Sequence, residues 1–151
     1  MTSGQIVALV VAIIAGVGGI QAVIWIPLVR KLQRMPDALR TELGGERLLF
    51  GPERASFAGA TAEYGRVGGI GVLALTERRL AFRRAVGNKV VDVPADHILA
   101  VTEAHRWMGR RVGGRTFLIL KLASGAQLGF IVADHAGCKA AIERLVAGRA
   151  A

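Results

Sequence analysis

Arginines are the residues of this sequence best suited to binding an anionic partner, and they are concentrated in two segments. Residues 105–115, HRWMGRRVGGR, hold four arginines together with Trp107 and Met108 and no acidic residue. Residues 77–89, ERRLAFRRAVGNK, hold five basic residues against one acid, Glu77. Basic side chains meet the phosphates of an anionic lipid surface, and an indole inserts at its interface. The candidate lipid- or partner-binding residues are therefore Arg83, Arg84, Arg106, Trp107, Arg110, Arg111 and Arg115.

A second interpretation of these segments stays open. An arginine-rich sequence places cations at solvated hairpin tips without any binding role, and Trp107 would then pack on a sheet. Nucleic acid is disfavoured as a partner, because Tyr64 is the only tyrosine and no aromatic platform for stacking bases is evident. The partners that the sequence favours are a lipid surface or another protein.

No set of residues in the sequence predicts catalysis or metal binding. The histidines His97, His105 and His135 are far apart in the chain. His135 and Cys138 have a spacing that would place two ligands on one helix face, but a metal needs three or four ligands and no third candidate is evident. The GRVGGIG stretch at 65–71 imitates a phosphate-binding loop, yet it leads into a predicted strand rather than a helix. We expect no metal, no cofactor and no enzymatic reaction.

The most apolar part of the sequence lies at its start. Residues 6–29 carry no charged side chain and would extend roughly 36 Å as a helix, enough to cross a hydrocarbon core of about 30 Å. A signal peptide would need a basic start, a shorter apolar run and a small-residue cleavage site. Trp25 suits a membrane–water boundary. We expect residues 1–30 to form an uncleaved transmembrane anchor, with a buried core helix as the alternative.

Charge predicts the orientation of this anchor. Arg30, Lys31, Arg34 and Arg40 follow the span and no basic side chain precedes it, so the N-terminus should lie outside and the rest in the cytoplasm. The lone Cys138 fits a reducing compartment. We expect a single-pass plasma-membrane protein. Small residues four apart in the span leave homo-oligomerisation through this helix open.

The apolar pattern changes after the span. Residues 31–45 suggest a juxtamembrane linker in which Pro36 starts a short helix and Gly44 ends it. From residue 46 the apolar period becomes two, which predicts strands. A short apolar run at 47–50 and a turn at 51–53 come first. About seven short strands follow, at 55–64, 70–76, 78–84, 89–93, 97–107, 116–123 and 127–133.

The stretch LTERRLAF at 75–82 predicts a hairpin. Its three consecutive charges sit at a tight reversal, with apolar alternation resuming on either side. Leu73, Leu75, Leu80 and Phe82 should then face one core.

The last segment predicts an amphipathic helix. Asp134 is a suitable N-cap, and apolar residues then recur at helical spacing. The apolar stripe consists of Cys138, Ala141, Ile142, Leu145 and Val146. The expected fold is mainly β: an N-terminal transmembrane helix, then a bent antiparallel sheet or open barrel of about seven strands closed by a C-terminal helix.

Several motifs, in order, resemble the GRAM/pleckstrin-homology-like (PH-like) domain. They are a G-x-L-x-L-T-x-x-R-L-x-F hairpin, an I-P-x-x-x-I-x-x-V segment with Val93 in place of isoleucine, and a final G-x-x-x-x-F strand. The matching residues are GVLALTERRLAF at 71–82, VPADHILAV at 93–101 and LILKLASGAQLGF at 118–130. The resemblance covers residues 46–148, and the whole chain resembles bacterial proteins with one span and a cytoplasmic PH-like domain. It implies a PH-like domain at 46–151 with a binding role.

The sequence thus predicts a membrane-anchored binding module. One hypothesis is contact with anionic phospholipid head groups through the basic loops. The alternative is a protein–protein adaptor or assembly factor at the inner membrane face, using an exposed strand edge or a groove beside the C-terminal helix. Ionic strength separates the two, because lipid docking weakens steeply with salt.

Overall fold

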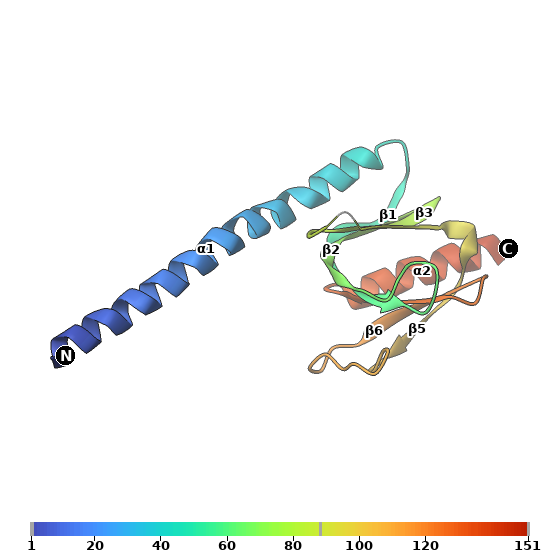
Figure 1. Ribbon diagram of the computed structural model, residues 1–151. Helices are drawn as coiled ribbons and strands as arrows, with labels where there is room; N and C mark the ends of the chain where they lie inside the picture. The colour runs from blue at the N-terminus through green and yellow to red at the C-terminus, as the bar shows by residue number, and fades with distance from the viewer. Residues whose placement is uncertain (1, 88, 151) are drawn as a thin grey trace.

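The computed structural model consists of one long N-terminal helix, a curled β-sheet and a C-terminal helix (Figure 1). It describes residues 2–87 and 89–150, without the side chains at positions 14, 16–24 and 150. In chain order the elements are α1 (Ser3–Glu42), β1 (Leu48–Ala60), β2 (Gly69–Thr76), β3 (Arg79–Arg84), β4 (Val90–Pro94), the short 3-10 helix η1 (Ala95–His97), β5 (Ile98–Ala104), β6 (Phe117–Leu122), β7 (Gln127–Val132) and α2 (His135–Ala150).

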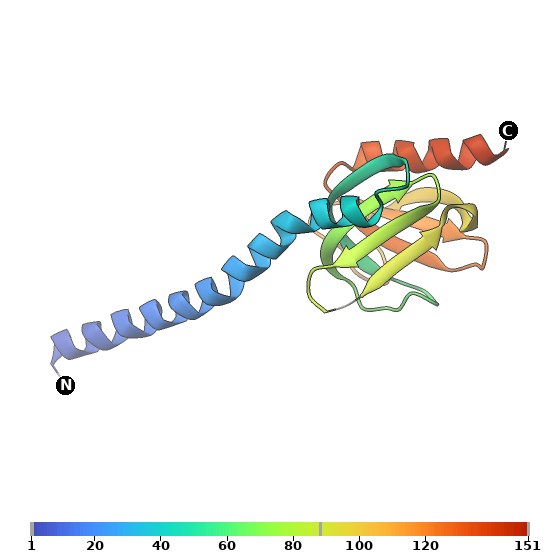
Figure 2. The ribbon, with the colours of Figure 1, turned by 90° about the horizontal axis from the view of Figure 1, so that it is seen from above.

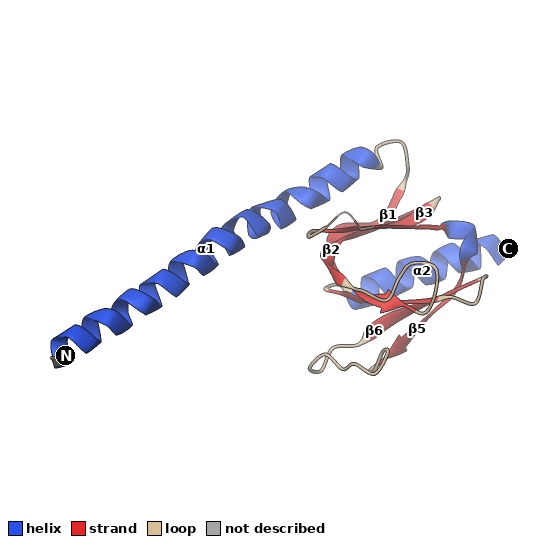
Figure 3. Cartoon of the chain, in the orientation of Figure 1, coloured by secondary structure: helices blue, strands red, loops and turns tan. Residues whose placement is uncertain are grey.

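The seven strands form one antiparallel sheet in the order β4-β3-β2-β1-β7-β6-β5. The sheet curls into a half-barrel, and α2 lies inside the curl, between its two halves (Figures 1 and 3). The face toward α2 is called the concave face here, and the opposite face the convex face. The predicted class, mainly β with a closing C-terminal helix, is therefore confirmed.

β1 differs from the sequence-based expectation. The sequence predicts a turn at 51–53 before a separate strand at 55–64, whereas the structure has one continuous strand. Its pairing with β2 skips from Phe50 to Glu53, and Gly51, with a φ of +75°, lies in the resulting bulge. A bulge bends a strand without ending it. β1 lies between β2 and β7: it pairs with β2 from Leu48 to Phe57 and with β7 from Ala55 to Ala60, which joins the two halves of the curl.

The β2–β3 hairpin forms as predicted. Leu73 lies opposite Phe82 and Leu75 opposite Leu80, and all four side chains are buried. The hydroxyl of Thr76 accepts hydrogen bonds from two backbone N–H groups of the turn, at 3.2 and 3.1 Å. The turn therefore keeps its charges in solvent while the four apolar side chains meet in the core.

Three aromatic rings dominate the core between the sheet and α2. Phe57, Phe82 and Phe130 come from β1, β3 and β7, and their ring centroids lie 5.2 to 5.8 Å apart. α2 begins as predicted, because Asp134 Oδ1 accepts a hydrogen bond from the Gly137 backbone N–H at 3.0 Å. The predicted apolar stripe of α2 packs on this core through Cys138, Ala141, Ile142, Leu145 and Val146.

α1 runs without interruption past Pro27 and Pro36 to Glu42. The prediction that residues 31–45 form a linker with a separate short helix starting at Pro36 is therefore wrong in its secondary structure. A proline inside a helix removes one backbone hydrogen bond and crowds the preceding turn. Packing of the helix end against the sheet offsets this cost.

The end of α1 covers the convex face of β2 and β3, and the rest of the helix projects away from the sheet (Figure 2). Leu39 and Leu43 are 2% and 1% exposed, and they pack on Val72, Ala74 and Ala81. Alternate residues of a strand point to opposite faces. At Val72, Ala74 and Ala81 the two strands are therefore buried on both faces, by the core on one side and by α1 on the other, whereas Ile70 at the start of β2 stays exposed.

Within the described part of the chain, no helix combines the length and the apolar character needed to cross a membrane. The predicted span at 6–29 includes positions 14 and 16–24, whose side chains lie outside the described residues. The transmembrane anchor at residues 1–30 stays a prediction from the sequence.

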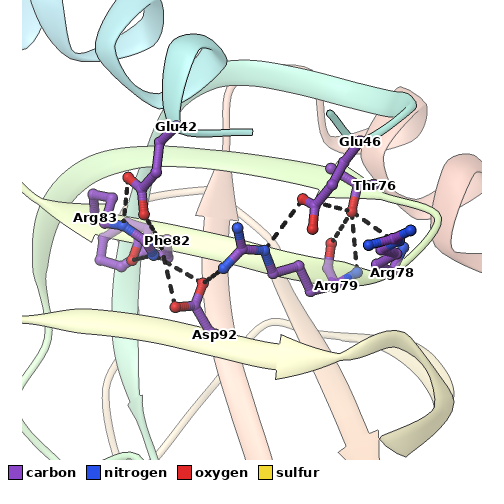
Figure 4. Close-up of polar contacts among 8 residues, drawn as sticks. All are labelled: Glu42, Glu46, Thr76, Arg78, Arg79, Phe82, Arg83 and Asp92. Atoms are coloured by element: carbon purple, nitrogen blue, oxygen red, sulfur yellow. Dashed lines mark hydrogen bonds and ion pairs between the residues drawn. The ribbon is translucent and has the colours of Figure 1, made fainter. Parts of the chain in front are cut away.

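Charged side chains fasten the end of α1 to the sheet (Figure 4). Arg83, only 14% exposed, donates hydrogen bonds to Glu42 Oε2 at 3.2 Å and to Asp92 Oδ1 at 2.9 Å. Arg79 continues the network: its Nη1 lies 3.5 Å from Asp92 Oδ1, and its Nε lies 3.2 Å from Glu46 Oε2. The hydrogen bond from Arg83 lowers the pKa of Glu42 below its ordinary value of 4.5. The network thus joins α1, β3 and β4 around the apolar contact.

Replacing Glu42 by Gln is expected to destabilise the protein in a pH-dependent way. Because folding lowers the pKa of Glu42, its carboxylate stabilises the folded state above pH 4.5, and this stabilisation is lost as the pH falls through the lowered value. The measurement is the difference in urea midpoint between wild type and Glu42→Gln over a pH series. Glu63→Gln, at an exposed position, is the control. A difference that stays constant below pH 4.5 would contradict the ion pair.

Candidate functional site

The β5–β6 connection, residues 105–115, presents the arginines singled out in the sequence. β5 ends at Ala104, earlier than predicted, because Trp107 and Arg110 pair with each other. Each of these two donates its backbone N–H to the other's carbonyl oxygen, at 2.9 and 2.8 Å. The two residues between them have φ angles of 48° and 77°, as in a type I′ turn. The exposed cations of this loop are Arg106, Arg110, Arg111 and Arg115.

Trp107 is buried, as the second interpretation of the sequence expects for this side chain. Its indole Nε1–H donates a hydrogen bond to the Gly59 carbonyl oxygen at 3.1 Å, and its ring packs with Phe117 and Ile119. The indole also lies against Gly129, where a Cβ atom would come 2.5 Å from Nε1. Trp107 therefore anchors the loop on the convex face of the sheet. In this fold the indole is not available for insertion into a lipid interface.

The exposed apolar side chains of the loop are instead Met108 and Val112, at 38% and 39% exposure. Val112 lies at a hollow of about 420 Å³ together with His105, Arg111 and Arg115. Among the residues that the structure describes, those lining this hollow include no acidic side chain. The tip of the loop therefore combines cations with a small apolar surface.

Two other turns carry further cations, and one of them lies directly beside this loop. A Cβ atom placed on Gly59 would come 2.4 Å from the Arg66 carbonyl oxygen and 3.4 Å from Met108 Sδ, so the β1–β2 connection lies against the loop. Lys89 of the β3–β4 turn lies on the β1–β2 connection in turn, because a Cβ atom placed on Gly65 would come 2.5 Å from Lys89 Nζ, and this Nζ is 5.5 Å from the ring centroid of Phe57. Arg66 stands apart from the other cations in the sequence, so charge density along the chain gives no sign of it. We call the combined set the basic loop cluster: Arg66, Lys89, Arg106, Arg110, Arg111 and Arg115.

Arg83 and Arg84, also singled out in the sequence, serve the fold. Arg83 is held by the two carboxylates of the network that fastens α1. Arg84 donates from Nε to the Val86 carbonyl oxygen at 2.6 Å and from Nη1 to the Gly68 carbonyl oxygen at 3.3 Å. Arg84 thereby connects the β3–β4 turn to the β1–β2 connection. Both arginines position neighbouring elements: the charge of Arg83 is paired with carboxylates, whereas Arg84 is held by backbone carbonyl oxygens.

The titratable groups near the start of α2 make structural contacts. His135 Nε2 lies 2.8 Å from Glu103 Oε1, and Lys139 Nζ lies 3.5 Å from the same oxygen. Burial raises the pKa of the Cys138 thiol to about 12, so the sulfur stays protonated at neutral pH. Cys138 therefore belongs to the core, as the sequence suggests. Among the described residues, no three His, Cys, Asp or Glu side chains are placed to hold a metal ion.

Comparison with known proteins identifies the fold alone. No family model and no curated protein matches the chain. Among solved structures 27 chains match. One of them is the C-terminal domain of an unknown protein from Leishmania infantum, with a TM-score of 0.52 and 16% sequence identity, and the alignment covers 79% of this chain and 98% of that one. The shared architecture is a curled antiparallel sheet with a C-terminal helix, which is compatible with a PH-like fold.

Trp107→Ala is expected to lower the free energy of unfolding by about 3–5 kcal/mol, because it leaves a cavity on the sheet and an unpaired carbonyl at Gly59. The measurement is chemical denaturation followed by far-ultraviolet circular dichroism. Arg106→Ala, at the exposed neighbouring position, should change the midpoint little. Equal midpoints for the two variants would show that the indole does not anchor the loop.

Proposed function

We propose that residues 46–151 form a membrane-anchored, GRAM-type PH-like binding module that contacts anionic phospholipid head groups through the basic loop cluster. The observation that carries this proposal is that the β1–β2 connection lies against both the β5–β6 loop and the β3–β4 turn, which brings together cations from separate parts of the chain. The five arginines of the cluster are exposed, and Lys89 is half-buried. Within the described residues, none of these six cations takes part in an ion pair. Such a cluster is attracted to a surface of phosphates.

The position of α1 supports the proposal. A hollow of about 420 Å³ separates the helix from the β1–β2 and β3–β4 turns. Trp25 lines this hollow from the helix, and it also lies at the end of the predicted span. An indole at the membrane boundary would bring the turns that carry Arg66 and Lys89 close to the head groups. The lining residues include Trp25, Leu28, Leu32, Ile70 and Val86.

Electrostatic attraction is strong enough to orient the domain without a dedicated pocket. Each basic residue near an anionic surface contributes on the order of 1 kcal/mol. The attraction is screened over a Debye length of about 8 Å at physiological salt. A loop already held by Trp107 loses little conformational freedom when it binds. Binding is therefore expected to depend on surface charge and ionic strength.

A fragment of residues 31–151 tests the membrane contact, because it keeps the docked end of α1 and lacks the predicted span. It is expected to sediment with phosphatidylglycerol vesicles at low salt and to be released as salt rises. Substituting Arg106, Arg110 and Arg111 by Ser should release it at lower salt. Its single tryptophan, Trp107, should keep its emission wavelength, because the buried indole does not enter the lipid.

The matched control removes the same charge elsewhere on the domain. Arg78→Ser, Lys121→Ser and Arg144→Ser, combined in one variant, change exposed positions outside the basic loop cluster. This control should sediment much as the wild-type fragment does. If the folded wild-type fragment does not sediment with anionic vesicles at low salt, membrane contact is excluded and the adaptor function takes its place.

We further propose that the protein spans the plasma membrane once, with residues 30–151 in the cytoplasm. The support is the uncharged run at 6–29 and the basic residues that follow it. A reporter that is active only outside the cytoplasm should be inactive when fused to the C-terminus and active when fused to the N-terminus. Activity of the C-terminal fusion would reverse the orientation.

A groove beside α2 favours the adaptor as the second candidate function. A hollow of about 630 Å³ lies between α2 and the start of β1. Leu48, Leu49 and Leu145 line it together with Arg144. A helical or extended segment of a partner could bury this apolar surface. Such binding would tolerate salt, whereas lipid contact would not.

A further inference from the structure

The convex face of the sheet is covered at both sides and open in the middle. The end of α1 covers β2 and β3 on that face, and Trp107 lies over β6 and β7. Between these two covers lies a hollow of about 740 Å³, which we call the outer groove. Its lining includes Arg54, Ser56, Ile70, Arg115, Thr116 and Ile131.

The floor of the outer groove is a row of side chains across three strands. Ser56 of β1 is paired with Ile70 of β2 on one side and with Ile131 of β7 on the other. Ile70 is 57% exposed and Ile131 is half-buried. A branched apolar side chain left this exposed on a sheet face, between two covered regions, is typical of an interaction surface.

The rim of the outer groove is cationic. Arg54 and Arg115 are exposed, and none of the described residues that line the groove is acidic. Within the described residues, neither arginine takes part in an ion pair, and the hydroxyls of Ser56 and Thr116 make no hydrogen bond. The groove therefore offers two charges and two hydroxyls to an occupant.

The apolar surface continues beyond the outer groove. Ile70 also lines the hollow beside α1, where Leu28 and Val86 extend the same surface. The combined surface carries apolar side chains together with the cations and hydroxyls of the outer groove. An extended peptide can offer both kinds of partner in one short segment, because successive side chains point to opposite sides and can face the floor and the rim of the groove in turn. A continuous acyl chain or a small anion would leave one of the two kinds of group without a partner.

We propose that the outer groove binds an extended acidic segment of another protein. Its apolar side chains contact Ile70 and Ile131, and its carboxylates lie near Arg54 and Arg115. Complementary charge selects the partner, and the net charge of +9 steers acidic segments toward the domain. This binding is a second activity beside membrane contact: Arg115 belongs to both surfaces, whereas Arg106, Arg110 and Arg111 are proposed for membrane contact alone.

The experiment uses the full-length protein in nanodiscs of phosphatidylcholine. The probe is a short fluorescein-labelled peptide of alternating glutamate and leucine, and its binding is followed by fluorescence anisotropy. Arg54→Glu should weaken binding about ten-fold or more, because it replaces an attraction by a repulsion. Ile70→Thr keeps the β-branched shape but removes apolar contact, and it should weaken binding about four-fold.

Controls separate this proposal from membrane contact. Arg78→Glu makes the same charge change at the β2–β3 turn and should leave peptide binding within about two-fold of wild type. The variant with Ser at positions 106, 110 and 111 should bind the peptide as wild type does, even where its vesicle binding is lost. The melting temperature of each variant is measured as well, and peptide affinities are compared only for variants that melt at the wild-type temperature.

Three results would overturn the proposal. The first is that the glutamate–leucine peptide does not bind, or binds no more tightly than a lysine–leucine peptide. The second is that Arg54→Glu and Ile70→Thr bind it as wild type does. The third is that Arg54→Glu loses vesicle binding while peptide binding is unchanged, which would assign the groove to lipid.

Discussion

Leu39 and Leu43 remove from water an apolar strip of β2 and β3 that α2 cannot reach. Strand geometry creates the strip, because residues alternating with the core positions must point to the convex face. Ala74 and Ala81 are small enough for the helix to lie close to the strands, and the ion pairs of Arg83 close the edge of the contact. This contact sets the direction in which α1 leaves the sheet. It therefore also sets how the basic loop cluster and the outer groove are presented relative to the helix.

The arginines of this protein differ in role according to their partners, although they look alike in the sequence. Arg79 and Arg83 lie on strands beside carboxylates, and Arg84 is held by backbone carbonyls of two turns. An arginine whose donors are already satisfied within the fold has little to offer a ligand. The arginines at 106, 110 and 111 belong to a segment, 105–115, that contains no acidic residue, and within the described part of the chain they form no ion pair.

The loop between β5 and β6 is anchored at its base and open at its tip. Trp107 is held by Phe117, Ile119 and the Gly59 carbonyl, so the loop is ordered before any partner arrives. Prior ordering reduces the conformational entropy lost on binding. Arg115 belongs to both the basic loop cluster and the outer groove. An anionic lipid surface and an acidic protein segment would therefore compete for this residue, which couples the two proposed activities.

By itself, the sequence determined the features that depend on spacing along the chain. The register of the β2–β3 hairpin, with Leu73 opposite Phe82, and the cap and apolar stripe of α2 follow from local periodicity and turn chemistry, and the structure confirms them. Only the tertiary structure decided that α1 continues past Pro36 onto the sheet, that Trp107 packs over Gly129, and that Arg66 joins the basic loop cluster. These features join residues far apart in the chain. A local pattern shows that an apolar or charged side chain needs a partner, but it does not show which distant residue provides it.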